Sequence, residues 1–303
     1  MLMKSSWFQP ITKALIELLN SFYIELQSPL ADLNAVMMVA WQDVLNLRYY
    51  IDDQGILFIL GTFCGKNYGW GPPIGKNVTL SHIDSFLSLL KSINRQPSSI
   101  LYLWEGYSLF PSIQLHEGFN VSNQASEYIY STQLLAELPN IEMKSLRKNR
   151  DYFLRRYKPI IEEYSNVHTK DCLAVLERWR EQKKENVPEN SLDKFEIESR
   201  VCRRALELDL PLNGMVMYIG DKPVGFSLGG KHSNDCFNCM FEKTDLTYNG
   251  LSVAIFSRLG SFLQGEYEFV NAGEDWGVEY LKDTKLKWKP VLVRDSFELS
   301  CDG

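Results

Sequence analysis

The spacing of hydrophobic and polar residues predicts alternating helices and strands in the first half of the chain. Apolar residues recur with a helical period between Pro10 and about Leu26, and again after a capping Thr79 or Ser81. Residues 35–63 are rich in Val, Ile, Tyr, Phe and Trp, so we expect strands there. The Gly- and Pro-rich residues 65–77 are predicted to form a loop.

The second half repeats this order of elements. Helical patterns cover 141–158, 169–184, 192–208, 251–264 and 276–285, and strand patterns cover 214–230, 236–243, 267–273 and 291–299. Two halves with a similar order predict an α+β protein made of two similar domains, at 1–135 and 136–303. The boundary is expected between residues 125 and 145.

Length and composition narrow the class of protein. The 303 residues suffice for two domains of about 150 residues each. A net charge of −6 argues against a protein that binds DNA over its whole surface, but it is compatible with a local basic patch. No apolar run approaches the roughly 18–20 residues that span a bilayer. We therefore expect a cytoplasmic protein without a transmembrane segment.

The six cysteines are expected to be reduced thiols, mostly in buried strands. Cys236 and Cys239 form a single CxxC, and His232 lies four residues before it. A structural zinc site needs a fourth ligand at a recognisable spacing, and the sequence offers none. No metal is expected.

A basic segment at 142–158 is the first candidate binding element. On a helix, Arg147, Arg150 and Lys158 lie near one stripe, and Lys148 lies on another. Such cations bind phosphates by charge and by bidentate hydrogen bonds, which makes Lys148 and Arg150 candidate substrate-binding residues. The alternative is the solvated face of an amphipathic helix.

An acidic pair, Glu274 and Asp275, is the candidate catalytic feature. It follows a predicted strand, and a carboxylate there could act as a base on an attacking amine or hydroxyl. Lys282 and Lys285 lie one turn apart on the next helix and could hold a phosphate or carboxylate group. The alternative is structural: the charges complement the helix dipole, and Asp275 caps the helix.

Residues 271–290, called the late block below, resemble a bacterial family allied to the C-terminal domain of phosphatidylglycerol lysyltransferase. Two earlier segments share this resemblance. The earlier segments are a Tyr-x-Tyr strand and a Lys/Arg-rich helix. The matching positions are Tyr128, Tyr130, Lys148, Arg150, Asn271, Asp275, Gly277, Leu281, Lys282, Lys285, Leu286 and Pro290. The chain departs from the family pattern in two places: the spacing after Asn271 is one residue shorter, and Trp288 replaces a tyrosine. A weaker match includes Trp41 and residues 68–75.

The resemblance implies two tandem GNAT-like domains, with mixed central sheets flanked by helices. It also implies aminoacyl transfer from a tRNA ester to an amine or hydroxyl, and a substrate-binding role for Asn271. GNAT enzymes that use acyl-CoA carry a Gln/Arg-x-x-Gly-x-Gly/Ala turn for the pyrophosphate. At that place the chain has only Tyr248-Asn249-Gly250, where Tyr248 and Asn249 either orient a ligand or form a plain turn. An aminoacyl-tRNA donor is therefore favoured over acyl-CoA.

The favoured prediction is an acyltransferase that moves an aminoacyl group from a tRNA-like donor to an amine or hydroxyl. The alternatives are a non-catalytic GNAT-like module that binds an anionic ligand, and a CoA-dependent N-acyltransferase. The expected partners are an anionic small molecule or tRNA, and transient contact with a membrane surface is compatible with the sequence. Fold-level kinship alone does not decide among these functions.

Overall fold

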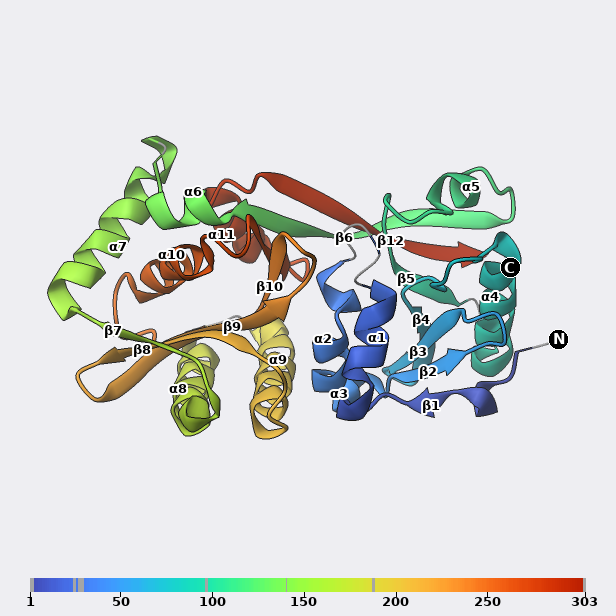
Figure 1. Ribbon diagram of the computed structural model, residues 1–303, viewed down its shortest axis with the longest axis horizontal. Coiled ribbons are helices and arrows are strands. Elements are labelled where there is room, and N and C mark those ends of the chain that lie inside the picture. Colours follow the sequence, from blue (N-terminus) through green and yellow to red (C-terminus); the bar gives the residue numbers. More distant parts are fainter. Residues whose placement is uncertain are drawn as a thin grey trace. The chain divides into compact units, whose positions relative to one another are not determined.

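The computed structural model describes residues 3–23, 26, 30–95, 98–139, 141–186 and 189–301. These form two compact units of mixed helices and strands, drawn in Figure 1, so the α+β prediction is confirmed. The first unit comprises Met1–Glu127, Glu274–Gly277 and Val293–Gly303, and the second comprises Tyr128–Gly273 and Val278–Leu292. The ranges 1–135 and 136–303 stay a prediction for the domain boundary.

The first unit contains a mixed sheet with short helices before it in the chain. Its helices are α1 (Ile16–Tyr23), α2 (Ala35–Ala40), α3 (Gln42–Leu45), α4 (Leu80–Asn94) and α5 (Phe110–Gln114). Its strands are β1 (Gln9–Pro10), β2 (Arg48–Ile51), β3 (Leu57–Phe63), β4 (Lys66–Trp70), β5 (Ser99–Leu103), the start of β6 (Phe119–Ser131) and nearly all of β12 (Leu292–Cys301). Strands β1 to β4 form an antiparallel meander, and β5 joins β4 in parallel after the crossover through α4.

The strand prediction for residues 35–45 is wrong, because this segment forms α2 and α3. The Asn34 side chain accepts hydrogen bonds from the backbone N–H groups of Val36 and Met37, at 2.9 and 3.4 Å. This cap satisfies donors that a helix otherwise leaves open, so it favours a helix over the strand tendency of the β-branched residues. Strands begin only at Arg48.

The loop prediction for residues 65–77 is wrong in its first part, where residues 66–70 form β4. Gly69 is paired with Leu60 of β3 and with Ile100 of β5. A Cβ atom on Gly69 would lie 2.7 Å from Phe86 of α4 and 2.8 Å from Ile100. The glycine thus allows α4 to pack closely on the strand, and it does not interrupt the strand.

The second unit repeats the order of meander, helix and parallel strand. Its helices are α6 (Thr132–Glu137), α7 (Lys144–Tyr157), α8 (Thr169–Asn186), α9 (Glu189–Glu207), α10 (Leu251–Leu263) and α11 (Glu279–Lys287). Its strands, besides the end of β6, are β7 (Ile160–Glu163), β8 (Asn213–Ile219), β9 (Lys222–Lys231), β10 (Cys236–Thr244) and β11 (Phe269–Glu274). The meander β7 to β10 is antiparallel, and β11 joins β10 in parallel after α10.

Helices cover both faces of this second sheet, as Figure 1 shows. Helix α10 packs on β8, β9 and β10, while α8 packs on β9 and β10 from the other face. The core on the α10 side includes Phe153, Phe237 and Ile255, all fully buried. A sheet buried on both faces explains the nearly continuous apolar sequence of β8 and β9.

Candidate functional site

The strands β10 and β11 are paired over only part of their length. Their parallel register joins Cys236 to Phe269 and ends at Asn238 and Asn271, although β10 continues to Thr244. Beyond this point β10 stays paired with β9 on its other side. The carboxyl ends of parallel strands joined by a helical crossover are where open sheets bind ligands. The side chains around this end of the ladder therefore form the candidate site.

A β-bulge in β10 brings the side chains of Cys239 and Glu242 to the same place. The register with β9 shifts between Cys239 and Phe241. The hydroxyl oxygen of Ser227 on β9 lies 3.5 Å from both Cys239 Sγ and Glu242 Oε2. Residues three apart on a regular strand lie on opposite faces, so the extra residue of the bulge is what brings Cys239 and Glu242 to one hydroxyl.

Glu242 has the properties of a proton-transfer group. Burial raises the pKa of its carboxyl group to about 8, although the positive charges of Lys243 and Lys285 and the hydrogen bond with Ser227 act in the opposite direction. The side chain is surrounded by protein atoms, yet part of it remains accessible. A carboxyl group that titrates near neutral pH can both accept and return a proton there, as a general base requires.

Lys285, a predicted substrate-binding residue, fastens α11 to the end of β11. Its ammonium group donates hydrogen bonds to the carbonyl oxygens of Ala272, at 2.6 Å, and Gly273, at 3.2 Å. It also lies 5.6 Å from the ring centre of Tyr128, and the Tyr130 hydroxyl donates to the Lys285 carbonyl oxygen at 3.0 Å. The side chain therefore shapes the end of β11 and adds a positive charge near Glu242.

The other two predicted binding residues of the late block, Asn271 and Lys282, differ in their exposure to solvent. Asn271 is fully buried, and its side-chain oxygen accepts a hydrogen bond from the backbone N–H of Gly273 at 2.9 Å. Lys282 is exposed on α11. Asn271 thus helps to form the bend at the end of β11, and substrate binding by either residue stays a prediction.

The turn after β10 is organised around a carboxylate of the chain itself. Burial alone would raise the pKa of Asp245, but hydrogen bonds from Thr247, Gln182 and Lys222 hold it well below its usual range. The guanidinium of Arg178 lies 3.3 Å from the same carboxylate. Asp245 is therefore ionised and fully engaged by neighbouring donors.

The backbone of this turn is engaged as well. The N–H of Leu246 donates to the Gln182 side chain at 2.7 Å, and the N–H of Thr247 donates to the Asp245 carboxylate at 3.1 Å. The N–H of Tyr248 donates to the Asp245 carbonyl oxygen at 3.3 Å. Three successive backbone donors are thus satisfied by the chain itself.

Packing explains the glycine of the Tyr248-Asn249-Gly250 turn. Gly250 has a φ of +86°, and a Cβ atom there would lie 2.5 Å from the carbonyl oxygen of Asn149 on α7. The ring of Tyr248 packs against Tyr157, with centroids 5.2 Å apart, while Asn249 is exposed. The turn allows α10 to approach α7 closely, and a ligand-orienting role for Tyr248 and Asn249 stays a prediction.

Two arginines of the basic helix α7 bind carbonyl groups at the end of α6. Arg147 donates a hydrogen bond to the Leu138 carbonyl oxygen, and Arg150 donates to that of Ala136 at 2.7 Å. Such contacts satisfy carbonyls that a helix end leaves open. Lys148 is exposed, so of the two candidate phosphate binders on this helix it is the more accessible.

The acidic pair Glu274 and Asp275 belongs to the first unit. Asp275 is only 8% exposed, and its carboxylate accepts a hydrogen bond from the N–H of Gly277 at 2.9 Å. Helix α11 begins four residues later, at Glu279, with Val278 at its N-cap position and no side-chain cap. The capping interpretation of Asp275 is therefore wrong, and its catalytic role stays a prediction.

Glu274 lies near further carboxyl groups of the first unit. Burial, followed by the charges of Asp32, Glu274 and Glu127, holds the pKa of Tyr102 well above its usual value. Burial and the charge of Glu127 raise the pKa of Asp32 to about 7. Glu127 itself accepts a hydrogen bond from the N–H of Ala31 at 2.7 Å. Mutual repulsion in a buried group of this kind favours retention of a proton.

The sequence interpretation missed Glu242, Ser227, Asp32 and Glu127. Glu242 and Glu127 did carry a signal, since each is a single acidic residue beside the apolar or aromatic residues of a predicted strand. Within the described ranges, no three His, Cys, Asp or Glu side chains gather in a way that could hold a metal ion. Nor does any described helix have the length and apolar character needed to cross a membrane.

The repeated arrangement of meander, crossover helix and parallel strand defines the class as tandem GNAT-like proteins. The fold resembles that of a tandem GNAT protein from the clavulanic acid biosynthesis pathway, with a TM-score of 0.51 and 8% identity over 98% of both chains. The sequence matches the family model described as phosphatidylglycerol lysyltransferase, C-terminal, over residues 30–297. The chain belongs to this family, as the sequence resemblance predicted.

Two further solved structures share the fold over nearly the whole chain. A conserved protein of unknown function from Bacteroides thetaiotaomicron has a TM-score of 0.86 at 20% identity, covering 99% of this chain and 100% of that one. The structure of L-PGS from Bacillus licheniformis has a TM-score of 0.65 at 15% identity, covering 94% of this chain and 91% of that one. Comparison with curated proteins finds no match.

Proposed function

We propose that this protein transfers an aminoacyl group from an activated donor of the aminoacyl-tRNA type to an amine or hydroxyl acceptor. Membership of a transferase family and the GNAT-like fold support acyl transfer in general. The observation that carries the proposal is Glu242, a carboxyl group with a pKa raised to about 8 near the end of the β10–β11 ladder. Cytoplasmic location stays a prediction.

In the proposed reaction the acceptor nitrogen or oxygen attacks the ester carbonyl carbon of the donor. A new C–N or C–O bond forms, the bond from the carbonyl carbon to the ribose oxygen breaks, and the leaving ribose oxygen gains a proton. The Glu242 carboxylate takes the proton of the attacking group and returns it to the ribose oxygen. Lys285 fixes the end of β11, and its charge helps Glu242 to ionise.

The turn after β10 supports an aminoacyl-tRNA donor over acyl-CoA. Pyrophosphate binding needs free backbone N–H groups at a turn that leads into a helix. Here the N–H groups of Leu246, Thr247 and Tyr248 already have partners, and the Asp245 carboxylate lies among them. We expect acetyl-CoA and longer acyl-CoAs to produce no thermal shift, because an anion at this turn would have to displace internal hydrogen bonds.

The catalytic role predicted for Glu274 and Asp275 is a separate proposal that concerns the first unit alone. Asp275 follows β11 directly and matches the family pattern, and Glu274 lies near Asp32 and Glu127. An acidic environment of this kind attracts an ammonium group. Amine acceptors and aminoacyl groups both carry one.

The test is a transfer assay with aminoacyl-tRNAs that carry radiolabelled amino acids. Phosphatidylglycerol vesicles are the first acceptor because of the family name, followed by a panel of soluble amines. Glu242→Gln should lower the rate of transfer by roughly 100-fold or more, the usual contribution of a general base. Glu163→Gln is the matched control, because Glu163 is exposed on the edge strand β7.

Two results would refute the proposal. Transfer by Glu242→Gln at the rate of the unsubstituted protein would exclude the base assignment. Binding and turnover of an acyl-CoA, without any transfer from aminoacyl-tRNA, would replace the proposed donor by the CoA alternative.

A further inference from the structure

The exposed face of α7 carries a row of positive charges. Lys144, Lys148 and Arg155 are all exposed, and their spacings of four and seven residues place them on one face of the helix. Tyr152 lies on the same face, four residues after Lys148, and is 43% exposed. These four residues are called the basic stripe below. No step of the proposed reaction uses the basic stripe.

The packing of α7 fixes the direction in which the basic stripe points. Leu146 and Phe153, on the opposite face of the helix, are buried in the hydrophobic core of the second unit. Arg147 and Arg150 bind carbonyl groups at the end of α6. These two arginines are therefore engaged within the protein, whereas the cations of the basic stripe face the solvent.

Nearby carboxylates do not neutralise the basic stripe. Asp151 is the one acidic residue of α7, and its carboxylate is bound by Arg150 Nε at 2.9 Å. Glu142, just before the helix, is bound by Lys289 at 2.5 Å. Within the part of the chain that the structure describes, the three cations of the basic stripe form no ion pair. They keep their positive charge on a chain whose net charge is −6.

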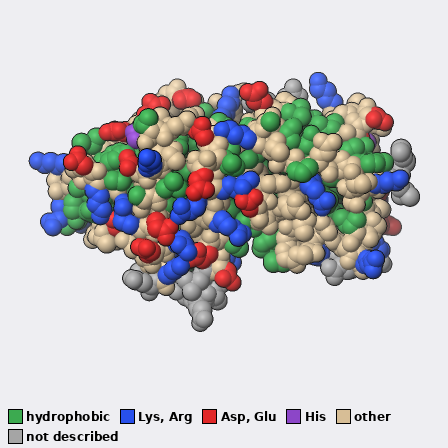
Figure 2. Space-filling view, turned by 90° about the horizontal axis from the view of Figure 1, so that it is seen from below, with side chains coloured by type: hydrophobic (Ala, Val, Ile, Leu, Met, Phe, Trp, Pro, Cys, Tyr) green, Lys and Arg blue, Asp and Glu red, His purple; other side chains and the backbone are tan. Residues whose placement is uncertain are grey.

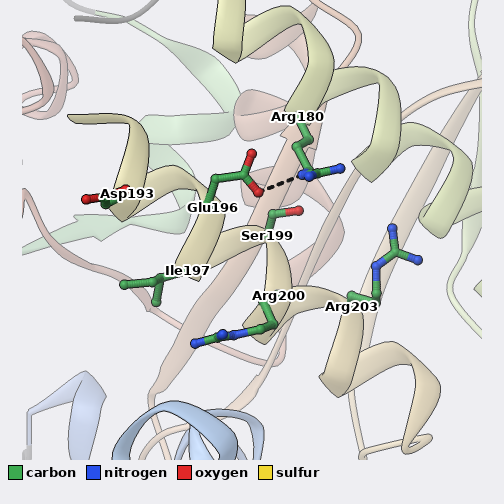
Figure 3. A pocket seen from close by; sticks show the side chains of 7 residues that line it. All are labelled: Arg180, Asp193, Glu196, Ile197, Ser199, Arg200 and Arg203. Atoms are coloured by element: carbon green, nitrogen blue, oxygen red, sulfur yellow. Dashed lines mark hydrogen bonds and ion pairs between the residues drawn. The ribbon is translucent and has the colours of Figure 1, made fainter. Parts of the chain in front are cut away.

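The pocket between α8 and α9, drawn in Figure 3, has no such excess of positive charge. Arg180 and Arg203 both bind Glu177, at 2.8 and 2.7 Å. Arg180 also binds Glu196 at 2.7 Å, and Glu207 lies 3.8 Å from Arg203. Figure 2 shows basic and acidic side chains interspersed over the region of α8 and α9. The arginines of this pocket are therefore matched by carboxylates, and we assign no ligand to it.

A row of cations with an exposed aromatic ring matches the chemistry of a single-stranded nucleic acid. Phosphates follow one another along such a strand, so cations arranged along a helix can bind more than one of them. Positions four residues apart, such as Lys144 and Lys148, are about 6 Å apart along the helix axis. The ring of Tyr152 lies between Lys148 and Arg155 in the sequence, where it can stack on an unpaired base.

The same face of α7 lacks the apolar anchors that a membrane surface requires. A helix that docks on lipid buries an apolar face among the acyl chains. The apolar face of α7 is already buried in the protein, and Tyr152 is the one large hydrophobic side chain of the basic stripe. The proposed donor, in contrast, contains RNA. These observations favour RNA over a lipid surface as the partner.

We propose that the basic stripe binds single-stranded RNA, with its three cations on backbone phosphates and Tyr152 stacked on an unpaired base. This inference rests on the proposed function, because it assigns a place for the RNA part of an aminoacyl-tRNA donor. Phosphate contacts and stacking do not read a sequence, so affinity should depend little on the bases present.

Binding is measured by fluorescence anisotropy with a non-aminoacylated RNA hairpin that has a single-stranded 3′ end, between about 50 and 200 mM salt. The double substitution Lys148→Gln and Arg155→Gln should weaken binding roughly 10- to 30-fold at about 100 mM salt. It should also reduce the slope of log affinity against log salt by about 1.4, because two phosphate contacts with a single strand are lost. The matched control is Lys170→Gln on α8 with Arg200→Gln on α9, both exposed, and its effect should stay within about 2-fold.

The stacking role of Tyr152 is tested separately. Tyr152→Ala should weaken binding of the same hairpin by roughly 5-fold or more without a change in slope, because stacking involves no charge. Tyr152→Phe keeps the ring and should bind as the unsubstituted protein does. A blunt RNA duplex offers no unpaired base, so Tyr152→Ala should bind it with unchanged affinity.

Equal RNA affinity in the unsubstituted protein and in the double variant would overturn the inference, as would a loss no larger than that of the matched control. A loss confined to the binding of phosphatidylglycerol vesicles would also overturn it and would assign the basic stripe to a membrane surface. Because the RNA carries no amino acid, the assay reports on the basic stripe whether or not transfer occurs. Absence of transfer, with RNA binding that depends on the basic stripe, would count against the proposed function alone.

Discussion

Replacement of Glu242 by glutamine should raise the stability of the protein and lower its proposed transfer activity. Glutamine keeps the size of the side chain and can still bond to Ser227, but it never ionises. The folded protein raises the pKa of Glu242 from an ordinary 4.5 to about 8, chiefly by burial. The variant therefore removes the energetic cost of ionising this buried group, together with its capacity to accept a proton.

The size of the effect follows from the pKa. The folded state binds the proton more tightly than the unfolded state, so the penalty is absent below pH 4.5 and grows as pH rises to about 8. At about 1.4 kcal/mol per pH unit, it reaches roughly 3 kcal/mol at pH 7 and roughly 5 kcal/mol above pH 8. The pKa of about 8 already includes the charges of Lys243 and Lys285, but the glutamine amide does not reproduce every contact of the protonated carboxyl group, which offsets part of the gain. We expect a net gain of roughly 2–4 kcal/mol for the variant at pH 8.5.

The assay is urea denaturation of the protein and of Glu242→Gln at pH 5, 7 and 8.5, with the transfer rate measured at the same pH values. The stability advantage of the variant should increase with pH, while its transfer rate stays at least roughly 100-fold lower. In the unsubstituted protein, transfer should rise towards pH 8 as Glu242 becomes ionised.

A difference in stability that does not vary with pH would refute the reasoning, because Glu242 would then titrate at an ordinary pKa. The control is Glu163→Gln, which makes the same chemical change at an exposed site. Its stability relative to the unsubstituted protein should stay constant across this pH range.

Three further substitutions test the site and its supports. Lys285→Met removes the two hydrogen bonds that Lys285 donates to the carbonyl groups of Ala272 and Gly273. Urea denaturation should show that the free energy of unfolding falls by roughly 1–3 kcal/mol, and an unchanged value would contradict the structural role of Lys285. Gly250→Ala introduces a Cβ atom 2.5 Å from a backbone oxygen at a φ of +86°; a thermal melt should show a loss of roughly 1–3 kcal/mol, and an unchanged melting temperature would contradict it. Asp275→Asn keeps an oxygen that can accept the Gly277 hydrogen bond, so it should fold normally; transfer should fall by roughly 100-fold if the carboxylate acts on the acceptor, and full activity would exclude that role.

The periodic pattern was sufficient to predict the fold where elements are long. Helices α4, α8 and α9 and strands β8 to β10 lie close to the predicted ranges, because each presents several turns or pairs of residues to a core. Residues 35–45 were mispredicted because α2 and α3 are short, and the Asn34 cap decides their conformation. Gly69 was misread because the close approach of α4, which makes a glycine necessary, is a tertiary property.

The candidate site was harder to predict, because its parts come from separate strands. Ser227 and Glu242 meet through strand pairing, and the bulge that adds Cys239 leaves no mark in a single strand's sequence. The late block identified the family, yet the structure gives its residues different surroundings. Lys285 binds the end of β11 in the second unit, whereas Asp275 is buried in the first. A linear motif does not distinguish these roles.

The turn after β10 links the fold to the choice of donor. In a GNAT-like domain this turn leads into the helix of the β-α-β crossover, where backbone N–H groups and the helix dipole favour a pyrophosphate. In this chain Asp245 holds the same place with an internal negative charge, bound by Lys222, Arg178 and backbone donors. Folding has therefore already engaged three backbone N–H groups of this turn in internal hydrogen bonds.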